Sequence, residues 1–490
     1  MDERYIAAVD LGSSRIYLAV ARVEGNNTEV IYFDSVPSDG IQHSAIVNPR
    51  KAGDRIRVLL DKAQEELGVT IRQIVTNYPR YAVRQEIATG MIERSDPESS
   101  ITDEEVESLK DISLEDYPLE DTAKEYIYGA MVQSFSTDDY MNVREDDVVG
   151  MISKELRGNF KIFIGNKKNV FNIDAACNAA QVAIARKYFS TEVEAKAVLT
   201  KAETENGVAL VNMGAGVTSV SIFHSGILRY YGSIPFGGNT IRKDICNESG
   251  FSEKLAENLK LAYGACLPDK LQSLSEKILH INYDDGIPRQ ISVKYLSEVI
   301  DAREREIIEA VLWHIERSGL ADHLRNGVVL TGGAAILTNC ANLFKEMSGY
   351  TVRLGFARHL FTTSCAGVGE ADATTCIGMI LEARRDEGLN CAEMMAADAP
   401  EEEQQVSAPA ETVQPEAKEH LFSDEEMRTM AEGADEAKRR KEKERREQRE
   451  KEKKERQHKA TWFHKLAQKV GSAAQIADNA VGNLFDSTDN

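Results

Sequence analysis

One pattern of secondary structure occurs twice in this sequence, and it constrains the fold more than any other feature. Over residues 5–37 the sequence predicts an apolar strand, a glycine turn, a second strand, another turn and a third strand. The same order returns over residues 207–236, about 200 residues further along the chain. Amphipathic helices are predicted over residues 53–68 and 303–320. The chain is therefore predicted to be an α/β protein in which one supersecondary unit is duplicated.

The glycine turn of the first copy has the composition of a phosphate-binding loop. Asp10 ends the first strand, and Gly12, Ser13 and Ser14 then form a tight hairpin that Arg15 follows. Glycine lets the backbone approach a ligand closely, while backbone N–H groups and serine hydroxyls supply hydrogen-bond donors. We therefore expect this turn to hold a phosphate, with Arg15 adding positive charge.

Two further glycine turns follow later in the chain. One joins strands of the second copy, and the other lies between a predicted strand and the start of a predicted helix, where it could hold a nucleoside or a phosphate. Each turn alone is weak evidence, because glycine usually serves the turn itself. Together, two hairpins can grip a polyphosphate while the last turn closes over the base. The residues are Gly214, Gly216 and Thr218 in the second turn, and Gly332, Gly333 and Ala334 in the third.

A predicted helix over residues 252–264 adds two charged side chains to this set. Glu257 and Lys260 are three residues apart and therefore lie on one face of the helix. They could reach a ribose hydroxyl and the edge of an adenine. The alternative is that they form an ion pair on the surface of the helix.

The order of the three turns resembles the actin, Hsp70 and sugar-kinase superfamily, and within it the FtsA family of bacterial cell-division proteins. The resemblance runs from residue 3 to about residue 388 and includes ITDEEVESLKD, YGAMVQSFSTDDYMNVRE and GILRYYGSIPFGGNTIRKDI. It implies an actin-like two-domain ATPase fold with an inserted subdomain, which binds ATP and Mg²⁺ and uses Gly238 as well. It also implies self-association into dimers or filaments, contacts with other division proteins, and tethering of the tubulin-like FtsZ to the cytoplasmic face of the cell membrane at the division site.

The resemblance also gives expected domain boundaries. The first lobe is expected to comprise residues 1–80 and 163–200, the inserted subdomain 81–162, the core of the second lobe 201–240 and 312–390, and its outer subdomain 241–311. An acidic disordered linker (391–437), a charged helix (438–459) and an amphipathic helix (460–485) are expected to follow.

The sequence departs from the family where hydrolysis would occur. The second turn usually begins with Asp, but here Asn212 stands in that place, and Ala215 and Val217 replace a glycine and a threonine. Asp10 remains to hold Mg²⁺ indirectly, through water. We therefore expect ATP binding with slow or absent hydrolysis. Two alternatives stay open: a small-molecule kinase or phosphatase of the superfamily, and an interaction protein that resembles a pilus-assembly ATPase.

The end of the chain has the pattern of a helix that lies in a membrane surface. Large apolar residues recur every three or four positions after a basic stretch, and the stripe begins with an aromatic pair. Such a helix would bind an anionic leaflet through its apolar face and its flanking bases. The alternative is a helix that docks on the body of the protein or on a partner protein. The stripe comprises Trp462, Phe463, Leu466, Val470, Ala473, Ala477, Val481 and Leu484.

Composition narrows the remaining possibilities. A formal net charge of -21 disfavours nucleic acid as a partner, because phosphates repel such a surface. The 7 cysteines form no CxxC pair and are expected to be free thiols in a reducing cytosol. No stretch has the pattern of a signal peptide or the length of a transmembrane helix. We therefore expect a cytoplasmic, peripheral membrane protein.

Overall fold

The computed structural model describes residues 3–25, 27–281 and 289–394, and these lie in one compact unit, residues 1–399. Most of the expected linker, the charged helix and the amphipathic helix lie outside the described residues. The linker was expected to begin at residue 391, but Cys391 is buried and β20 (Ala392–Met394) pairs with β6 (Val69–Ile71). The folded body therefore continues to Met394.

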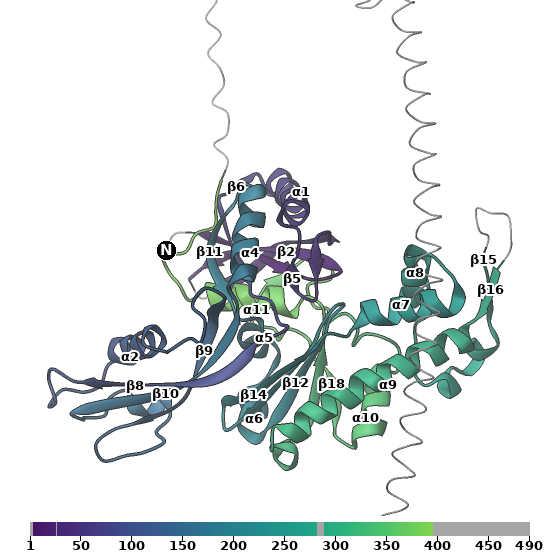
Figure 1. Cartoon of the computed structure of the whole chain (residues 1–490). Coiled ribbons are helices and arrows are strands. Elements are labelled where there is room, and N and C mark those ends of the chain that lie inside the picture. The colour runs from purple at the N-terminus through teal and green to yellow at the C-terminus, as the bar shows by residue number, and fades with distance from the viewer. Residues whose placement is uncertain (1–2, 26, 282–288, 395–490) are drawn as a thin grey trace, which may run out of the picture. The chain divides into compact units, whose positions relative to one another are not determined.

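The first lobe is built on a six-stranded mixed sheet (Figure 1). Its first three strands are antiparallel neighbours in chain order, and two later strands add in parallel beside the first. Helices α1 and α4 pack together, as do α5 and α11. In sheet order the strands are β11 (Ala183–Tyr188), β7 (Gln73–Asn77), β1 (Arg4–Leu11), β2 (Arg15–Glu24), β3 (Asn27–Pro37) and β19 (Thr362–Thr363); the helices are α1 (Pro49–Leu67), α4 (Lys167–Ala179), α5 (Ser190–Val198) and α11 (Thr374–Ala383).

The second lobe repeats this plan on a five-stranded sheet. Again three antiparallel strands follow one another, and a later strand pairs in parallel with the first of them. In sheet order the strands are β14 (Ile227–Ile234), β13 (Thr218–His224), β12 (Val208–Met213), β17 (Val328–Thr331) and β18 (Val352–Leu354); the helices are α6 (Lys201–Asn206), α7 (Gly238–Ser249), α8 (Glu253–Tyr263), α9 (Val293–Arg317) and α10 (Cys340–Ser348). The predicted duplication of one unit is confirmed.

A separate three-stranded sheet projects from the first lobe, at the left of Figure 1. Helix α2 (Asp103–Glu115) covers one of its faces and begins with a capping box between Thr102 and Glu105. Phe135 and Phe160 meet edge to face in its own small core, 5.9 Å between ring centres. Its strands are β8 (Arg84–Glu93), β10 (Glu155–Asn166) and β9 (Glu125–Ser136), with the short helix α3 (Glu145–Val148) beside them.

The predicted helices form, and two of them begin earlier than the sequence indicated. Helix α1 was predicted to begin at residue 53, yet it begins at Pro49, where the Asn48 side chain accepts a hydrogen bond from the Lys51 N–H. Helix α9 was predicted from residue 303 but begins at Val293. The remaining elements are the hairpins β4 (Ile41–Gln42) with β5 (Ala45–Ile46) and β15 (Ile278–Ile281) with β16 (Arg289–Ser292), and the 3-10 helices η1 (Pro268–Lys270), η2 (Gln272–Glu276) and η3 (Ala321–His323).

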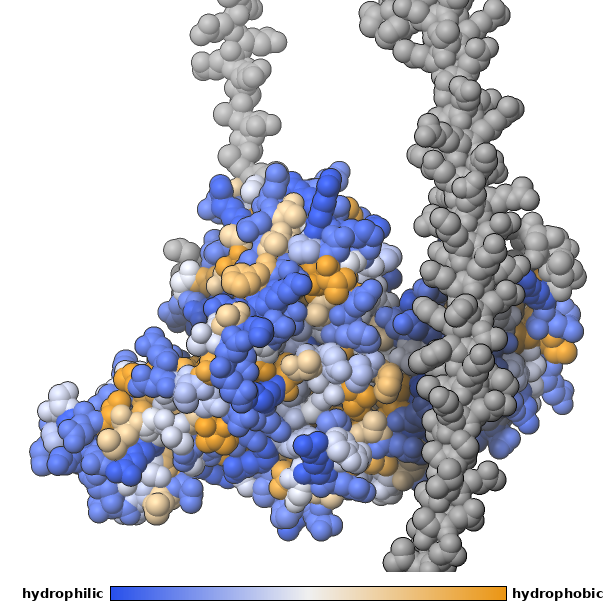
Figure 2. Space-filling view, in the orientation of Figure 1, coloured by the Kyte–Doolittle hydropathy of each residue, from blue (hydrophilic) through white to orange (hydrophobic). Residues whose placement is uncertain are grey.

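Within the described residues, no helix is both long enough and apolar enough to cross a bilayer. On the face drawn in Figure 2, apolar side chains are scattered among polar ones. The cysteines of the described residues are all free.

Candidate functional site

The first two glycine turns lie against each other, although about 200 residues separate them. A Cβ atom built on Gly216 would lie 2.6 Å from Ser13 Oγ, so only glycine fits there. His43 Nδ1 forms a hydrogen bond of 2.9 Å with the Gly216 carbonyl oxygen, and the Ser44 N–H donates to Ser13 Oγ over 2.8 Å. The two hairpins therefore form one site at the ends of β1 and β12.

The third turn packs on the second. Gly332 has a φ of 86°, and a Cβ atom there would lie 2.6 Å from the Met213 carbonyl oxygen. The Ala334 N–H donates to the same oxygen over 2.9 Å, and the Gly332 N–H donates to the Ala371 oxygen over 3.0 Å. All three predicted turns therefore meet at the carboxyl ends of β1, β12 and β17, where ligands of open α/β sheets usually bind.

The third turn does not lead directly into a helix, which corrects one expectation. Helix α10 begins only at Cys340, and turns and bends fill the interval. Because the Gly332 and Ala334 N–H groups already donate to carbonyl oxygens, no helix N-terminus offers free donors to a phosphate here. The expected role as a helix N-terminus for a phosphate is therefore not supported, and contact with a nucleoside stays a prediction.

Helices α7 and α8 bring Gly238, Glu257 and Lys260 to the second and third turns. The Gly238 N–H donates to the Gly214 oxygen over 3.1 Å. Lys260 Nζ donates to the Gly238 oxygen over 3.0 Å and pairs with Glu257 Oε2 at 2.8 Å. The ion pair of the alternative reading therefore forms, between a buried lysine that is 7% exposed and a glutamate whose side chain is 23% exposed. Contact with a nucleotide stays a prediction for these two residues.

Several buried polar atoms beside this pair have no hydrogen-bond partner. They include Asn239 Oδ1, Arg242 Nε, Glu257 Oε2 and both carboxyl oxygens of Glu304. Glu257 Oε2 touches the Lys260 ammonium but accepts no well-directed hydrogen bond. Buried polar groups in proteins almost always have partners, so these atoms of α7, α8 and α9 are candidates for hydrogen bonds to polar groups of a ligand.

Asp10 lies at the end of β1, beneath the first turn, and is only 8% exposed. Burial raises its pKa to about 6; the nearby Arg80 guanidinium opposes that rise, and the Glu194 carboxyl adds to it. Within the described residues, no group of three or more His, Cys, Asp or Glu side chains is arranged to hold a metal ion directly.

Below the turns, a buried network joins the two lobes, and sequence reasoning missed it. Glu194 on α5 pairs with Arg80 at 3.0 Å and accepts hydrogen bonds from Asn212 Nδ2, from Thr331 Oγ1 at 2.6 Å and from Thr374 Oγ1 at 3.0 Å. All five side chains are less than one tenth exposed. The one available signal was a glutamate at an apolar position of a short helix rich in small residues.

The other predicted site residues have partners within the protein. Arg15 Nε donates to Ser35 Oγ over 2.8 Å, so it lies along β3. Thr218 is fully buried, and its hydroxyl donates to the Phe236 oxygen over 2.9 Å. The Ser14 carbonyl oxygen accepts from the Ser38 N–H over 2.8 Å. Gly333 stands apart, because a Cβ atom there would meet only Asp372 Cβ, at 3.9 Å.

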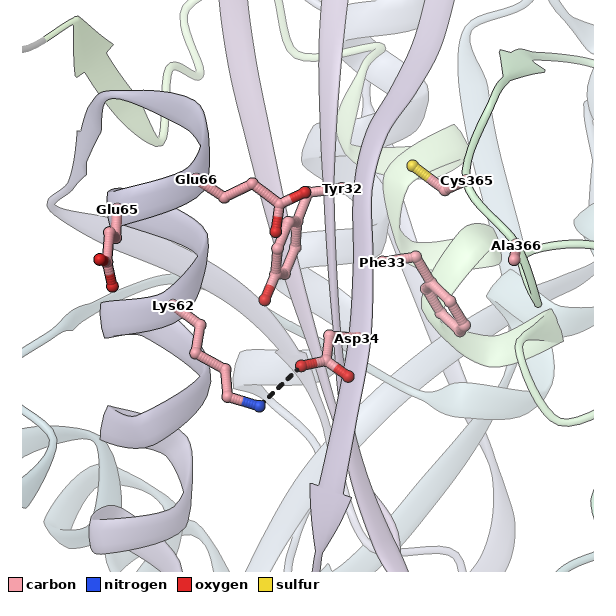
Figure 3. Close-up of a pocket in the computed structure, with 8 residues that line it drawn as sticks. All are labelled: Tyr32, Phe33, Asp34, Lys62, Glu65, Glu66, Cys365 and Ala366. Atoms are coloured by element: carbon pink, nitrogen blue, oxygen red, sulfur yellow. Dashed lines mark hydrogen bonds and ion pairs between the residues drawn. The ribbon is translucent and has the colours of Figure 1, made fainter.

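A hollow of about 670 Å³ lies elsewhere in the first lobe, between α1, β3 and the segment around Cys365 (Figure 3). Lys62 and Asp34 form an ion pair of 3.1 Å across it. It contains none of the predicted site residues.

Comparisons with known proteins agree with the resemblance in the sequence. The profile of a family described as "Cell division protein FtsA" matches residues 209–378, which contain the second and third turns. Among curated proteins, the cell division protein FtsA of Borreliella burgdorferi is 27% identical over 395 residues, which cover 80% of this chain and 93% of that protein. FtsA of Neisseria meningitidis is 26% identical, over 79% of this chain and 92% of that protein.

The chain is therefore similar to cell division protein FtsA over most of its length. A solved structure of the PilM-PilN type IV pilus biogenesis complex has a TM-score of 0.55 at 13% identity and covers 77% of this chain and 98% of that chain. At such identity the likeness concerns the fold alone. It supports a mixed α/β, actin-like fold for the described residues.

Proposed function

We propose that this chain is an ATP-binding cell-division protein that assembles with copies of itself and tethers the tubulin-like FtsZ ring to the cytoplasmic face of the membrane. The observation that carries the nucleotide part is the meeting of three glycine turns at one place. Two hairpins from the two lobes face each other, and the third turn, with α7 and α8, lies beside the second.

We assign the phosphates, the Mg²⁺ ion, the base and the ribose each to particular residues of this site. Backbone groups of Gly12–Ser14 and of residues 214–216 would hold the phosphates. Asp10 would face the water shell of Mg²⁺, whose positive charge would offset that of the phosphates. Gly333 and Ala334 would face the base, while the unpartnered oxygens of Asn239 and Glu257 would accept hydrogen bonds from ribose hydroxyls.

Hydrolysis by this site would be slow or absent. Asn212 stands near the second turn, and its amide group is committed to Glu194. The second turn therefore offers no carboxylate that could orient an attacking water. A small-molecule kinase or phosphatase would need such a carboxylate, which disfavours that alternative. The similarity to the pilus protein concerns the fold alone and does not favour a role in pilus assembly.

The tethering part of the proposal rests on the similarity to FtsA and on the sequence of residues 460–485. The apolar stripe and the basic stretch before it have the pattern of an interfacial helix. One weak anchor per molecule becomes a strong one when many copies assemble, since their tails bind together. Self-assembly and membrane binding would therefore reinforce each other.

Co-sedimentation of the full chain tests the whole proposal. Anionic liposomes, purified FtsZ from the same organism, and magnesium-ATP are added singly and together. We expect FtsZ to sediment with liposomes only when this chain is present, and more so with magnesium-ATP. Sedimentation of FtsZ that is independent of this chain, or of its tail, would refute the tethering role. Calorimetry with ATP tests the nucleotide site separately.

A further inference from the structure

The buried network beneath the turns explains why residue 212 is an asparagine. Asn212 lies at the end of β12 and directs its two polar atoms to opposite sides. Its Nδ2 donates to Glu194 Oε1 and to Thr331 Oγ1, the latter over 3.2 Å. Its Oδ1 faces the turns, because Cβ atoms built on Gly332 and Gly214 would lie 2.8 and 3.6 Å from it.

The chemistry of Glu194 allows only this orientation. An ionised carboxylate is an acceptor without donors, so the atom of residue 212 that meets it must carry hydrogen. Glu194 is 1% exposed, and its other oxygen pairs with Arg80 at 3.0 Å. A carboxyl at position 212 would place two like charges in contact in a buried site, which is strongly unfavourable.

We propose that Glu194 is a positioning residue that requires an amide at position 212, and so sets the charge that the second glycine turn presents to a polyphosphate. The inference rests on the proposed nucleotide function where it concerns ATP, but the coupling between the two side chains does not. Glu194 belongs to the first lobe and Asn212 to the second, so the pair also joins the lobes below the site.

Exchanging the two groups tests the coupling in the nucleotide-free protein. Asn212→Asp should lower the midpoint of thermal unfolding, because it faces Glu194 with a second carboxyl. Glu194→Gln should lower it as well, because Arg80 loses its counter-charge. The double variant E194Q/N212D restores a donor opposite an acceptor and keeps the net charge of the network. We expect it to recover at least half of the stability lost in N212D.

The same variants test the effect on the nucleotide site. In E194Q/N212D a carboxylate faces the turn. The ratio of the ATP affinity with Mg²⁺ to that without Mg²⁺ should therefore be about tenfold larger than in the natural protein. A factor of this size corresponds to one charge-assisted hydrogen bond. N212D alone should not gain this dependence, because its carboxyl is protonated or displaced by Glu194.

Each result decides a separate point. If the decrease in unfolding midpoint of the double variant equals the sum of the decreases in the two single variants, the coupling between Glu194 and Asn212 is refuted. If N212D alone does not fold, recovery of folded protein in the double variant is the supporting result. If N212D alone gains the full Mg²⁺ dependence, Glu194 does not set the charge at the turn. If the natural protein binds no ATP, the proposed function is refuted. The unfolding measurements on the three variants still test the coupling between Glu194 and Asn212.

Discussion

Gly332 and Gly333 are neighbours in the third turn but constrain the chain differently. Gly332 is held by backbone on both sides and has a positive φ, so a side chain there would disturb the fold. Gly333 has open space at its Cβ position. A substitution at Gly333 therefore probes the site, whereas one at Gly332 would mainly probe stability.

Gly333→Arg should abolish the binding of ATP without unfolding the protein. The new side chain would occupy the space that we assign to the nucleoside. Calorimetry with magnesium-ATP measures the loss, which we expect to exceed about tenfold in Kd, or about 1.4 kcal/mol. Gly388→Arg is the matched control, since Gly388 is exposed and distant in sequence from the three turns. Unchanged affinity in Gly333→Arg would show that the nucleoside site is wrongly assigned.

Glu304 should make the stability of the nucleotide-free protein depend on pH. Burial raises its pKa to about 8, which the Lys260 ammonium opposes. Between its ordinary pKa near 4.3 and about pH 8, the folded protein binds a proton that the unfolded chain releases. The contribution of Glu304 to stability therefore falls as the pH rises through this window.

Glu304→Gln removes that titration and keeps the shape of the side chain. We expect the variant to be more stable than the natural protein, with a difference that grows from pH 5 to about pH 8 and is constant above it. Urea unfolding at several pH values measures this difference. A difference that does not change with pH would mean that Glu304 is already ionised in the folded protein. A matched control is Glu309→Gln, an exposed change on the same helix.

At the scale of elements, Gly53 determines how closely α1 approaches α4. A Cβ atom there would lie 2.7 Å from both the Ala176 oxygen and Ala179 Cβ. Gly53→Val should push the helices apart and cost about 1–3 kcal/mol of unfolding free energy, as overpacked cores do. Urea unfolding measures the cost, with Arg55→Ala, an exposed change on the same helix, as the control. A cost no larger than that of the control would contradict the close contact.

The C-terminal amphipathic segment makes a spectroscopic prediction. In a Trp313→Phe background, Trp462 emission should shift to the blue when anionic liposomes are added, because the ring enters the headgroup boundary. Trp313 is half exposed on α9 beside Arg317, so its replacement should leave the body folded. Leu466→Glu should abolish the shift by placing a charge in the stripe. A shift with a protein partner but none with liposomes would make the segment a docking helix.

For the whole molecule, magnesium-ATP should stabilise the two lobes together. A ligand that binds only the folded protein stabilises it by about 2.7 kcal/mol at a concentration 100 times its Kd. Thermal unfolding should therefore shift upward with magnesium-ATP, less with ATP and a chelator, and not at all with Gly333→Arg. An equal shift in that variant would place ATP elsewhere, with the hollow near Lys62 as the next site to examine.

The sequence by itself determined the strands, the three glycine turns and their order. These features depend on residues that are close together in the chain: apolar alternation makes a strand, and glycine permits a tight turn. The resemblance to the FtsA family rests on the same local stretches. The expected start of α10 failed because the sequence does not show that the Gly332 and Ala334 N–H groups bond to residues far away.

Only the tertiary structure decided the partners of buried charges. Arg80, Glu194, Asn212 and Thr374 come from separate segments of the chain, and nothing local indicates that they meet. Likewise, Glu257 and Lys260 lie together on any helix, but only packing against Gly238 buries Lys260. A buried charge must find a counter-charge or donors wherever the fold supplies them, so its partner depends on which strand ends and helices meet, and not on spacing along the sequence.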